Sequence, residues 1–385
     1  MGNLHTRTVD PNRIQDENFM AAALDVARVI GERPWPNPPV GAVVVKDGQV
    51  VGSGAHQRAG QPHAEQVALA QAGAQAAGAT LYVTLEPCNH EGRTPPCAPT
   101  VVRSGIRRVV AAIRDPNPRV AGGGCRFLSE RGVAVQLGVM AREALDLVWP
   151  FVVTGGFGRP YLELKLAQSL DGLFAPDPRR RDSHAPVYLT GTLSRVEVHR
   201  RRCWMDAVIV GEGTVLADRP RLDARLAGKP GDGPRARPRP VCLDSDLSLD
   251  PSLVSDPWLV LTGSAALSGR RARDLARSGA EVVAVPTRNG RLDPEGVLDA
   301  LNEAGLRTAL LEGGPRLAAS FLQAGVVDRW TLFTAPVVLG TGVGWPAERG
   351  AKDSFSLTQV TRCGQDTMAV YDRMSFLDQL LKVMA

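Results

Sequence analysis

The stretch that decides the fold is PHAE at residues 62–65, followed by EPCNHEGRTPPC at residues 86–97. The first segment contains His63 and Glu65, and the second contains Cys88 and Cys97. One imidazole and two thiolates supply three zinc ligands, whereas a structural zinc site needs four. A zinc held by three protein side chains keeps one position for water and lowers the pKa of that water to about 7. These residues therefore predict a hydrolytic zinc site in which Glu65 moves the protons.

Each of these residues has a simpler explanation when it is taken alone. His63 could cap a helix, and either cysteine could be a small buried side chain. A structural zinc with His90 as the fourth ligand is a stronger alternative, but it does not explain Glu65. His-x-Glu followed by Pro-Cys is the pattern of zinc-dependent nucleobase deaminases, in which the Glu is not a ligand. The combination favours a deaminase centre, with a non-catalytic scaffold stabilised by zinc as an alternative.

The sequence around these motifs alternates between helical and extended patterns. Apolar residues recur at helical spacing from Asp16 to Gly31, and residues 1–15 are expected to lack a fixed structure. The other elements expected in the first half are strands at 40–45, 50–53, 80–84, 108–113 and 134–138, and helices at 62–77, 97–104 and up to residue 149. Such alternation predicts a layered α/β sheet with helices on its faces.

The composition changes at TGGFGRP, residues 154–160, and we expect a domain boundary near residue 150. The predicted domains are residues 16–150 and 151–385. The second half alternates again, with strands expected at 161–166, 207–210, 241–244, 259–262, 281–285, 308–312 and 327–334, and helices at 193–202, 266–278, 294–304 and 315–323. It contains no Gly-x-Gly-x-x-Gly, the dinucleotide fingerprint. EGGP at 312–315, between a strand and a helix, instead predicts backbone N–H groups that bind an anion.

Length, charge and cysteine content narrow the class of protein. A chain of 385 residues with 44% hydrophobic residues favours two or three domains. Six cysteines at irregular intervals and no secretory leader predict a cytoplasmic protein without a disulfide framework or membrane anchor. The net charge of +5 is small for this length, and the basic runs contain few aromatic residues. We therefore expect a small phosphorylated ligand and no nucleic acid.

The first-half motifs closely resemble those of a known enzyme family. PHAE at 62–65, TLEPCNHEGRTPPC at 84–97 and DPNP at 115–118 are similar to the bifunctional riboflavin biosynthesis deaminase/reductase. The similarity runs from about Asp16 to the C-terminus. It implies a cytidine-deaminase-like three-layer α/β/α domain, a dihydrofolate-reductase-like α/β domain, Zn²⁺, NADPH and a homo-oligomer. The implied reactions are hydrolytic deamination of 2,5-diamino-6-ribosylamino-4(3H)-pyrimidinone 5′-phosphate and NADPH-dependent reduction of its ribosyl group to ribityl.

The same resemblance implies roles for single residues. In the deaminase half, His63, Cys88 and Cys97 hold zinc and Glu65 is catalytic. The implied contacts to the pyrimidine and its phosphate are Asn37, His56 and His90. The implied substrate positions of the reductase half are Tyr188, Arg202, Leu222, Arg225 and Glu312. The implied NADPH positions are Ala167, Thr190, Thr214, Asp218, Ser245, Gly314 and Pro315.

The second half departs from the family pattern at several positions. Leu173-Phe174 follow the Ser-Leu-Asp-Gly turn where a basic residue and Ala are usual, and Tyr188 replaces a Trp. Arg219 and Asp223 stand where Asp and Thr are expected. These changes leave two alternatives beside the bifunctional enzyme. One is an active deaminase with a degenerate or repurposed reductase domain, and the other is a nucleic-acid-editing deaminase whose second half binds RNA.

Overall fold

The computed structural model describes residues 11–30, 36–92, 94–117, 122–177, 179, 187–225, 238–346 and 354–373. The chain divides into two compact units between Gly158 and Arg159. The expected boundary near residue 150 lies inside helix α5 (Ala141–Gly156), which continues through Pro150 with a kink at Val148. A proline bends a helix by removing one backbone hydrogen bond, and here the helix resumes after the bend.

The first unit is built on a five-stranded sheet of order β2-β1-β3-β4-β5. Its strands are β1 (Gly41–Lys46), β2 (Gln49–Ala55), β3 (Thr80–Val83), β4 (Arg108–Ala111) and β5 (Ala134–Leu137). Strand β1 pairs antiparallel with β2 and β3, whereas β3, β4 and β5 run parallel. The β1–β2 hairpin turns at Asp47 and Gly48, both with positive φ, as the Asp-Gly pair predicts.

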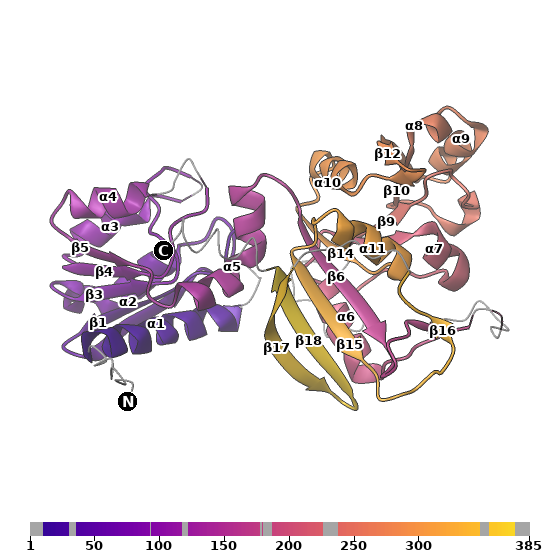
Figure 1. Ribbon diagram of the computed structural model, residues 1–385. Helices are drawn as coiled ribbons and strands as arrows, with labels where there is room; N and C mark the ends of the chain where they lie inside the picture. Colours follow the sequence, from indigo (N-terminus) through magenta and orange to yellow (C-terminus); the bar gives the residue numbers. More distant parts are fainter. Residues whose placement is uncertain are drawn as a thin grey trace, which may run out of the picture. The chain divides into compact units, whose positions relative to one another are not determined.

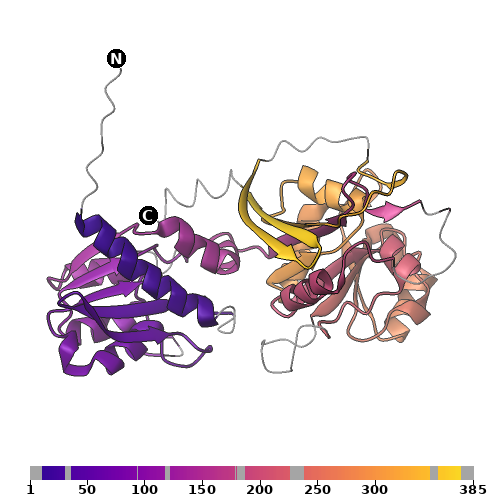
Figure 2. The ribbon, with the colours of Figure 1, turned by 90° about the horizontal axis from the view of Figure 1, so that it is seen from below.

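Helices cover both faces of this sheet. One face carries α1 (Pro11–Ile30), which Figure 2 shows lying across the strands. The other carries α2 (Ala64–Ala72, extended by a 3₁₀ turn), α3 (Cys97–Arg103) and α4 (Gly123–Ser129), whose apolar residues share one core with the strands. The contacts are close because the strands present glycines. A Cβ at Gly41 would lie 2.0 Å from a carbonyl of α1, and one at Gly52 2.2 Å from a carbonyl of α2.

The second unit contains a nine-stranded sheet of order β11-β10-β9-β8-β14-β6-β15-β18-β17. Its strands are β6 (Tyr161–Gln168), β8 (Ala207–Gly211), β9 (Arg239–Leu243), β10 (Leu259–Gly263), β11 (Glu281–Val285), β14 (Thr308–Leu311), β15 (Arg329–Thr334), β17 (Phe355–Cys363) and β18 (Asp366–Arg373). The strands from β11 to β15 are parallel, and β18 and β17 continue the sheet antiparallel, as the long yellow hairpin of Figure 1 shows. Short ladders join β7 (Ala175–Pro176) to β16 (Gly342–Val343) and β12 (Thr287–Arg288) to β13 (Arg291–Leu292).

Helices also pack on both faces of the larger sheet. Helices α10 (Pro294–Glu303) and α11 (Pro315–Gln323) join the main apolar core, and α6 (Thr192–Arg202) packs on the opposite face against Phe333 and Met368. The remaining helices are α7 (Glu212–Asp218), α8 (Ser264–Leu267), α9 (Arg270–Arg277) and a 3₁₀ turn at Pro251–Leu253.

Several sequence expectations are corrected by this structure. Helix α1 begins at Pro11, so residues 11–15 are helical, and proline is well suited to a first helical turn. The helix expected at 266–278 is two helices, because Gly269 adopts an extended conformation and caps α9. The sequence did not predict α4, α7 or the β17–β18 hairpin. Among the helices in the described ranges, none is long and apolar enough to cross a membrane.

Candidate active sites of the two domains

The first candidate site lies where helix α2 begins. His63 is the N-cap residue of α2, with extended backbone angles, and Glu65 lies in the first helical turn. Backbone N–H groups of a first turn have no partner within the helix and favour nearby negative charge. Glu65 is only 3% exposed. The helix start therefore holds an imidazole and a buried carboxyl two residues apart.

The two cysteines are supplied by the segment between β3 and α3. Cys88 follows the end of β3, and Cys97 is the first residue of α3. The backbone N–H of Cys97 donates to Cys88 Sγ at 3.4 Å, and the N–H of Ala98 donates to the Cys88 carbonyl at 3.0 Å. The eight-residue loop thus closes on itself and brings both sulfur atoms to the start of α3.

These elements bring the three predicted ligands together. His63 Nδ1 lies 3.5 Å from Cys88 Sγ and 3.3 Å from Cys97 Sγ, and all three ligand atoms lie within 4.8 Å of one another. Ligand atoms around a tetrahedral zinc are separated by about 3.5–3.8 Å, given Zn–S and Zn–N bonds of about 2.3 and 2.0 Å. The residues fit zinc. His90, the fourth ligand of the structural alternative, does not belong to this cluster in the described part of the chain.

The second nitrogen of His63 is also engaged, by a residue that the sequence did not single out. Thr94 Oγ1 lies 3.1 Å from His63 Nε2. When Nδ1 binds zinc, Nε2 carries the remaining proton and donates a hydrogen bond to Thr94 Oγ1. Such an outer hydrogen bond fixes the tautomer and orientation of a metal-binding imidazole.

The ionisation of the cluster follows from burial and from hydrogen bonds within it. The Cys97 thiol donates a hydrogen bond to Cys88 and lowers the pKa of Cys88 to about 4. The same hydrogen bond, together with burial, raises the pKa of Cys97. The hydrogen bond with Cys88 raises the pKa of His63. Burial raises the pKa of Glu65 to about 7. Cysteine binds zinc as the thiolate, so metal binding releases protons from this cluster.

A cavity of about 310 Å³ opens onto these residues. The predicted pyrimidine and phosphate residues Asn37, His56 and His90 line it together with His63, Glu65 and Cys88. The sequence did not assign roles to four other lining residues, Glu86, Asp115, Asn117 and Phe151. The predicted deaminase residues thus line one cavity, except Cys97, which is fully buried beside it.

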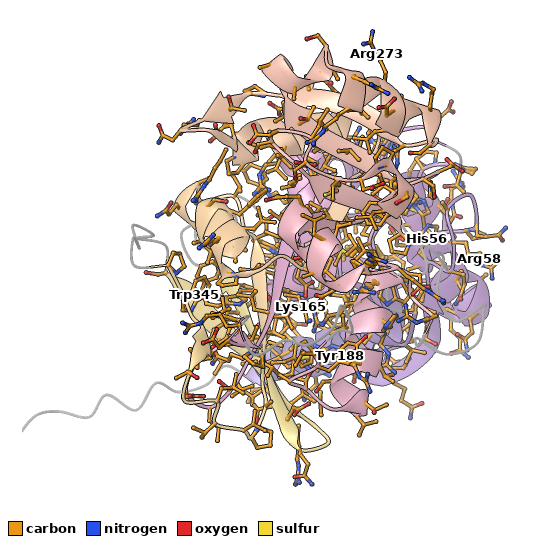
Figure 3. The ribbon with its side chains drawn as sticks, turned by 90° about the vertical axis from the view of Figure 1, so that its right-hand side faces the viewer. His56, Arg58, Lys165, Tyr188, Arg273 and Trp345 are labelled. Atoms are coloured by element: carbon orange, nitrogen blue, oxygen red, sulfur yellow. The ribbon has the colours of Figure 1, made fainter. Side chains whose placement is uncertain are left out.

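His56, labelled in Figure 3, is held from both sides of its ring. Its Nδ1 lies 3.1 Å from the carbonyl oxygen of Pro62, and its Nε2 lies 2.9 Å from Asn37 Nδ2. Because a carbonyl can only accept, Nδ1 carries the proton and Nε2 accepts from the Asn37 amide. Burial lowers the pKa of His56, in keeping with a neutral ring.

In the second unit, the predicted cofactor residues follow adjacent parallel strands. Ala167 lies near the end of β6, Thr214 and Asp218 lie on α7 after β8, Ser245 follows β9, and Gly314-Pro315 begin α11 after β14. These four strands are neighbours in the order β9-β8-β14-β6. Ligands bind at the carboxyl edge of such sheets. Gly314 is exposed and has open space around its Cα, as an anion-binding turn requires.

The predicted substrate residues Arg202 and Glu312 form a two-point ion pair. Arg202 Nε and Nη2 donate to the two Glu312 oxygens at 2.6 and 3.0 Å, and Nη1 donates to the Asp223 carbonyl at 2.9 Å. Both side chains are only about a tenth exposed. Burial opposes ionisation of Glu312, but Arg202 and Lys165 outweigh it and lower the pKa of Glu312.

The other predicted substrate residues and Thr190 differ in their surroundings. Arg225 pairs with the Asp223 carboxylate, one of the positions that depart from the family pattern. Tyr188 is 55% exposed, with the Arg195 guanidinium 4.5 Å from its ring centroid. Leu222 is buried and adopts a positive φ of 53°. Thr190 lies in the segment just before α6.

Two residues near the ion pair were missed by sequence reasoning. Lys165, labelled in Figure 3, lies on β6 with Nζ 3.8 Å from Glu312 Oε2, and burial lowers its pKa. A lone lysine in the strand YLELKLAQ was the available signal. His199 begins the basic run at residues 199–202, and it is only 6% exposed. Burial and Arg202 lower its pKa to about 4.

The Ser-Leu-Asp-Gly turn and the glycine-rich segment after β15 meet in the structure. Asp171 accepts hydrogen bonds from Ser169 Oγ at 2.6 Å and from the N–H groups of Leu339 and Gly340 at 3.1 and 2.8 Å. Its pKa is lowered to about 2 by these bonds, that of Ser169 first. The Ser-Leu-Asp-Gly turn and the segment at residues 339–340 thus form one loop cluster.

The fold and the site define a class, a zinc-dependent deaminase joined to a reductase. The family of the cytidine and deoxycytidylate deaminase zinc-binding region matches residues 13–113, and the RibD C-terminal domain matches residues 160–369. Riboflavin biosynthesis protein RibD of Aquifex aeolicus is 38% identical over 367 residues, covering 93% of this chain and 98% of the relative. That of Escherichia coli is 39% identical over 344 residues, covering 85% and 89%.

Solved structures give the same result. Acinetobacter baumannii RibD matches with a TM-score of 0.78 and 34% identity, over 94% of this chain and 99% of that one. The Thermotoga maritima deaminase/reductase matches with a TM-score of 0.74 and 31% identity, over 94% and 100%. The chain belongs to the RibD family and is a bifunctional deaminase and reductase of riboflavin biosynthesis. The fold class, the zinc-binding domain and the two activities expected from the sequence are confirmed.

Proposed function

We propose that the first domain hydrolyses the 2-amino group of 2,5-diamino-6-ribosylamino-4(3H)-pyrimidinone 5′-phosphate, and that the second uses NADPH to reduce the ribosyl group of the product to ribityl. The observation that carries the first step is the convergence of His63, Cys88 and Cys97 next to a cavity that the buried carboxyl of Glu65 also lines. Zinc, when it is bound by these three side chains, supplies an acidified water as the nucleophile.

Glu65 performs the proton transfers of this step. Its carboxylate accepts the proton of the attacking water and passes it to the ring nitrogen next to the amino group. The carboxylate then takes the second proton from the added oxygen and gives it to the amino group, which leaves as ammonia while the ring carbonyl forms. Burial at the start of α2 excludes bulk water from this exchange. Asn37, His56 and His90 orient the pyrimidine and its phosphate in the same cavity.

The reductase site lies at the edge where β9, β8, β14 and β6 end. There we assign NADPH to Ala167, Thr190, Thr214, Asp218, Ser245, Gly314 and Pro315, and the substrate to Tyr188, Arg202, Leu222, Arg225 and Glu312. NADPH, when bound, supplies a hydride to the ribosyl carbon. The Arg202–Glu312 pair is rigid enough to present a fixed guanidinium edge to a ligand. The choice of NADPH over NADH rests on the family resemblance, and titrating both cofactors tests it.

A specific observation keeps a second candidate open, an active deaminase with a weakened reductase. Asp223 occupies a position where the family pattern has Thr, and it pairs with Arg225, which is assigned to the substrate. An ion pair within the protein competes with an incoming phosphate for the same guanidinium.

One experiment separates the two candidates. The purified chain is given the diaminopyrimidine phosphate with and without NADPH, and the products are identified by mass. The bifunctional enzyme yields the deaminated ribosyl compound alone and the ribityl compound with NADPH. Deamination without reduction identifies the weakened reductase. No deamination contradicts the proposal itself.

The setting of the enzyme is part of the same proposal. We expect a small-molecule substrate, no nucleic-acid partner, a homo-oligomer and a cytoplasmic location. Free thiolate ligands and the supply of reduced nicotinamide both favour a reducing compartment. Light scattering of the purified chain tests the oligomer. Binding to tRNA at low salt, with a steep salt dependence, would instead favour the editing alternative.

A further inference from the structure

Glu86 is a buried carboxylate next to the metal loop to which the deamination chemistry assigns no role. It lies between β3 and Cys88 and is 3% exposed. Its own backbone N–H donates to the carbonyl of Ile113 at 2.9 Å, which continues the pairing of β3 with β4. Burial of a carboxylate is costly unless its oxygens accept hydrogen bonds. The partners of Glu86 therefore indicate what it does.

Three backbone N–H groups converge on the Glu86 side chain. Oε1 accepts from Cys125 at 2.9 Å, and Oε2 accepts from Gly122 at 2.9 Å and from Asp115 at 3.2 Å. These donors are 29 to 39 residues away in the sequence. Gly122 and Cys125 belong to the first turn of α4, where N–H groups have no partner in the helix.

A second contact fixes the same elements by packing. A Cβ added to Gly124 would lie 1.8 Å from the carbonyl oxygen of Pro87, so α4 begins directly on the backbone that precedes Cys88. The metal loop and the start of α4 are thus joined by three hydrogen bonds and one close contact. We call this arrangement the Glu86 clamp.

The clamp also fixes one wall of the cavity. Asp115 and Asn117 line the cavity that contains His63, Glu65 and Cys88. Asp115 Oδ1 accepts the N–H of Asn117 at 2.8 Å, so the two residues form one local turn. Because the Asp115 N–H is held by Glu86, the position of this turn relative to the metal ligands depends on Glu86.

We infer that Glu86 is a positioning residue of the deaminase. It holds the Asp115–Asn117 wall and the start of α4 at a fixed distance from the zinc ligands. The bound pyrimidine phosphate then has its amino group next to Glu65. This inference rests on the proposed deamination. It predicts an effect on substrate binding more than on chemistry, because the clamp does not contact the three metal-binding atoms.

Glu86→Gln tests the clamp with almost no change of shape. A glutamine side chain has one acceptor oxygen, so at least one of the three N–H groups loses its acceptor and faces an NH₂ group instead. We expect full zinc content, a KM for the diaminopyrimidine phosphate raised at least tenfold, and a kcat within threefold of wild type. Amide hydrogen exchange of Gly122 and Cys125 should become at least tenfold faster. Reduction of the deaminated compound should not change.

Two further variants separate positioning from general stability. Gly124→Ala leaves Glu86 intact but drives the start of α4 off Pro87, and it should raise KM in the same way without loss of zinc. Glu130→Gln removes an exposed charge at the end of the same helix and should leave KM and kcat unchanged.

Three outcomes overturn the inference. The first is a wild-type KM in Glu86→Gln with faster amide exchange. The second is loss of activity in proportion to loss of zinc, which would make Glu86 a support of the metal loop only. The third is unchanged exchange at Gly122 and Cys125. A wild-type chain that does not deaminate contradicts the proposed function instead, and the exchange measurement then still tests the clamp.

Discussion

Replacing Glu312 by Gln tests the ion pair on which the proposed reductase site depends. In wild type, the Glu312 carboxylate accepts two hydrogen bonds from Arg202, at 2.6 and 3.0 Å, and lies 3.8 Å from Lys165 Nζ. The amide keeps one acceptor oxygen, so one charge-assisted bond is lost and Arg202 is no longer held at two points.

The magnitude follows from the bond that disappears. A hydrogen bond to a charged group contributes about 1.5–3 kcal/mol, and both side chains are only about a tenth exposed, so water replaces little of it. If the fixed guanidinium binds the substrate in the transition state, kcat/KM for reduction falls about ten- to hundredfold. Lys165 also loses the Glu312 carboxylate, whose charge raises the pKa of Lys165 against the effect of burial. The pKa of Lys165 therefore falls further in the variant. If reduction needs Lys165 in its charged form, the decline of activity with rising pH begins at a lower pH in Glu312→Gln than in wild type.

The assay follows NADPH oxidation with the deaminated ribosyl compound as substrate. Deamination by the same preparation is the internal control and should be unchanged. Glu303→Gln, an exposed carboxylate at the end of α10, is the matched control for the loss of one charge. A kcat/KM for reduction within threefold of wild type in Glu312→Gln would refute the role of the pair.

Four further predictions concern the zinc site, the departure from the family pattern and the stability of the first domain. Cys88→Ala should lose most of the zinc together with deamination, and full zinc occupancy by metal analysis would contradict the ligand assignment. Glu65→Gln should keep zinc but reduce deamination about 10²–10⁴-fold, and a rate near that of wild type would exclude its proton-transfer role. Asp223→Asn should release Arg225 from its ion pair and lower the KM for the reductase substrate by up to about fivefold at low salt. The effect is small because partly exposed ion pairs contribute about 0–1 kcal/mol. A raised KM would show instead that Asp223 assists binding. Burial opposes ionisation of Asp16, but hydrogen bonds from Arg108 and Tyr82 outweigh it and lower its pKa below the usual value of 3.8. Its stabilising effect is therefore fully present only above about pH 5, and it is lost as the pH falls through the lowered pKa. Acid unfolding of Asp16→Asn, compared with wild type, should lack this component.

The metal site can be predicted from short stretches of sequence, because its parts are local. His63 and Glu65 are separated by one residue, and the two cysteines bracket a loop of eight residues. Such short spacings fix which side chains can share a helix start or a loop, whatever the rest of the chain does. The alternation of helices and strands predicted the layered sheets for the same reason. The periodicity of each segment is visible within about ten residues.

The tertiary structure decided what depends on distant pairings. Glu86 meets N–H groups 29 to 39 residues away, and Arg202 meets Glu312 across 110 residues. The pKa values of Lys165 and His199 are lowered chiefly by burial, and this burial arises when the sheet and α6 pack together. No short pattern encodes these contacts, since they arise from strand order and register. The sequence predicts which groups carry the chemistry, and the fold shows which residues hold those groups in place.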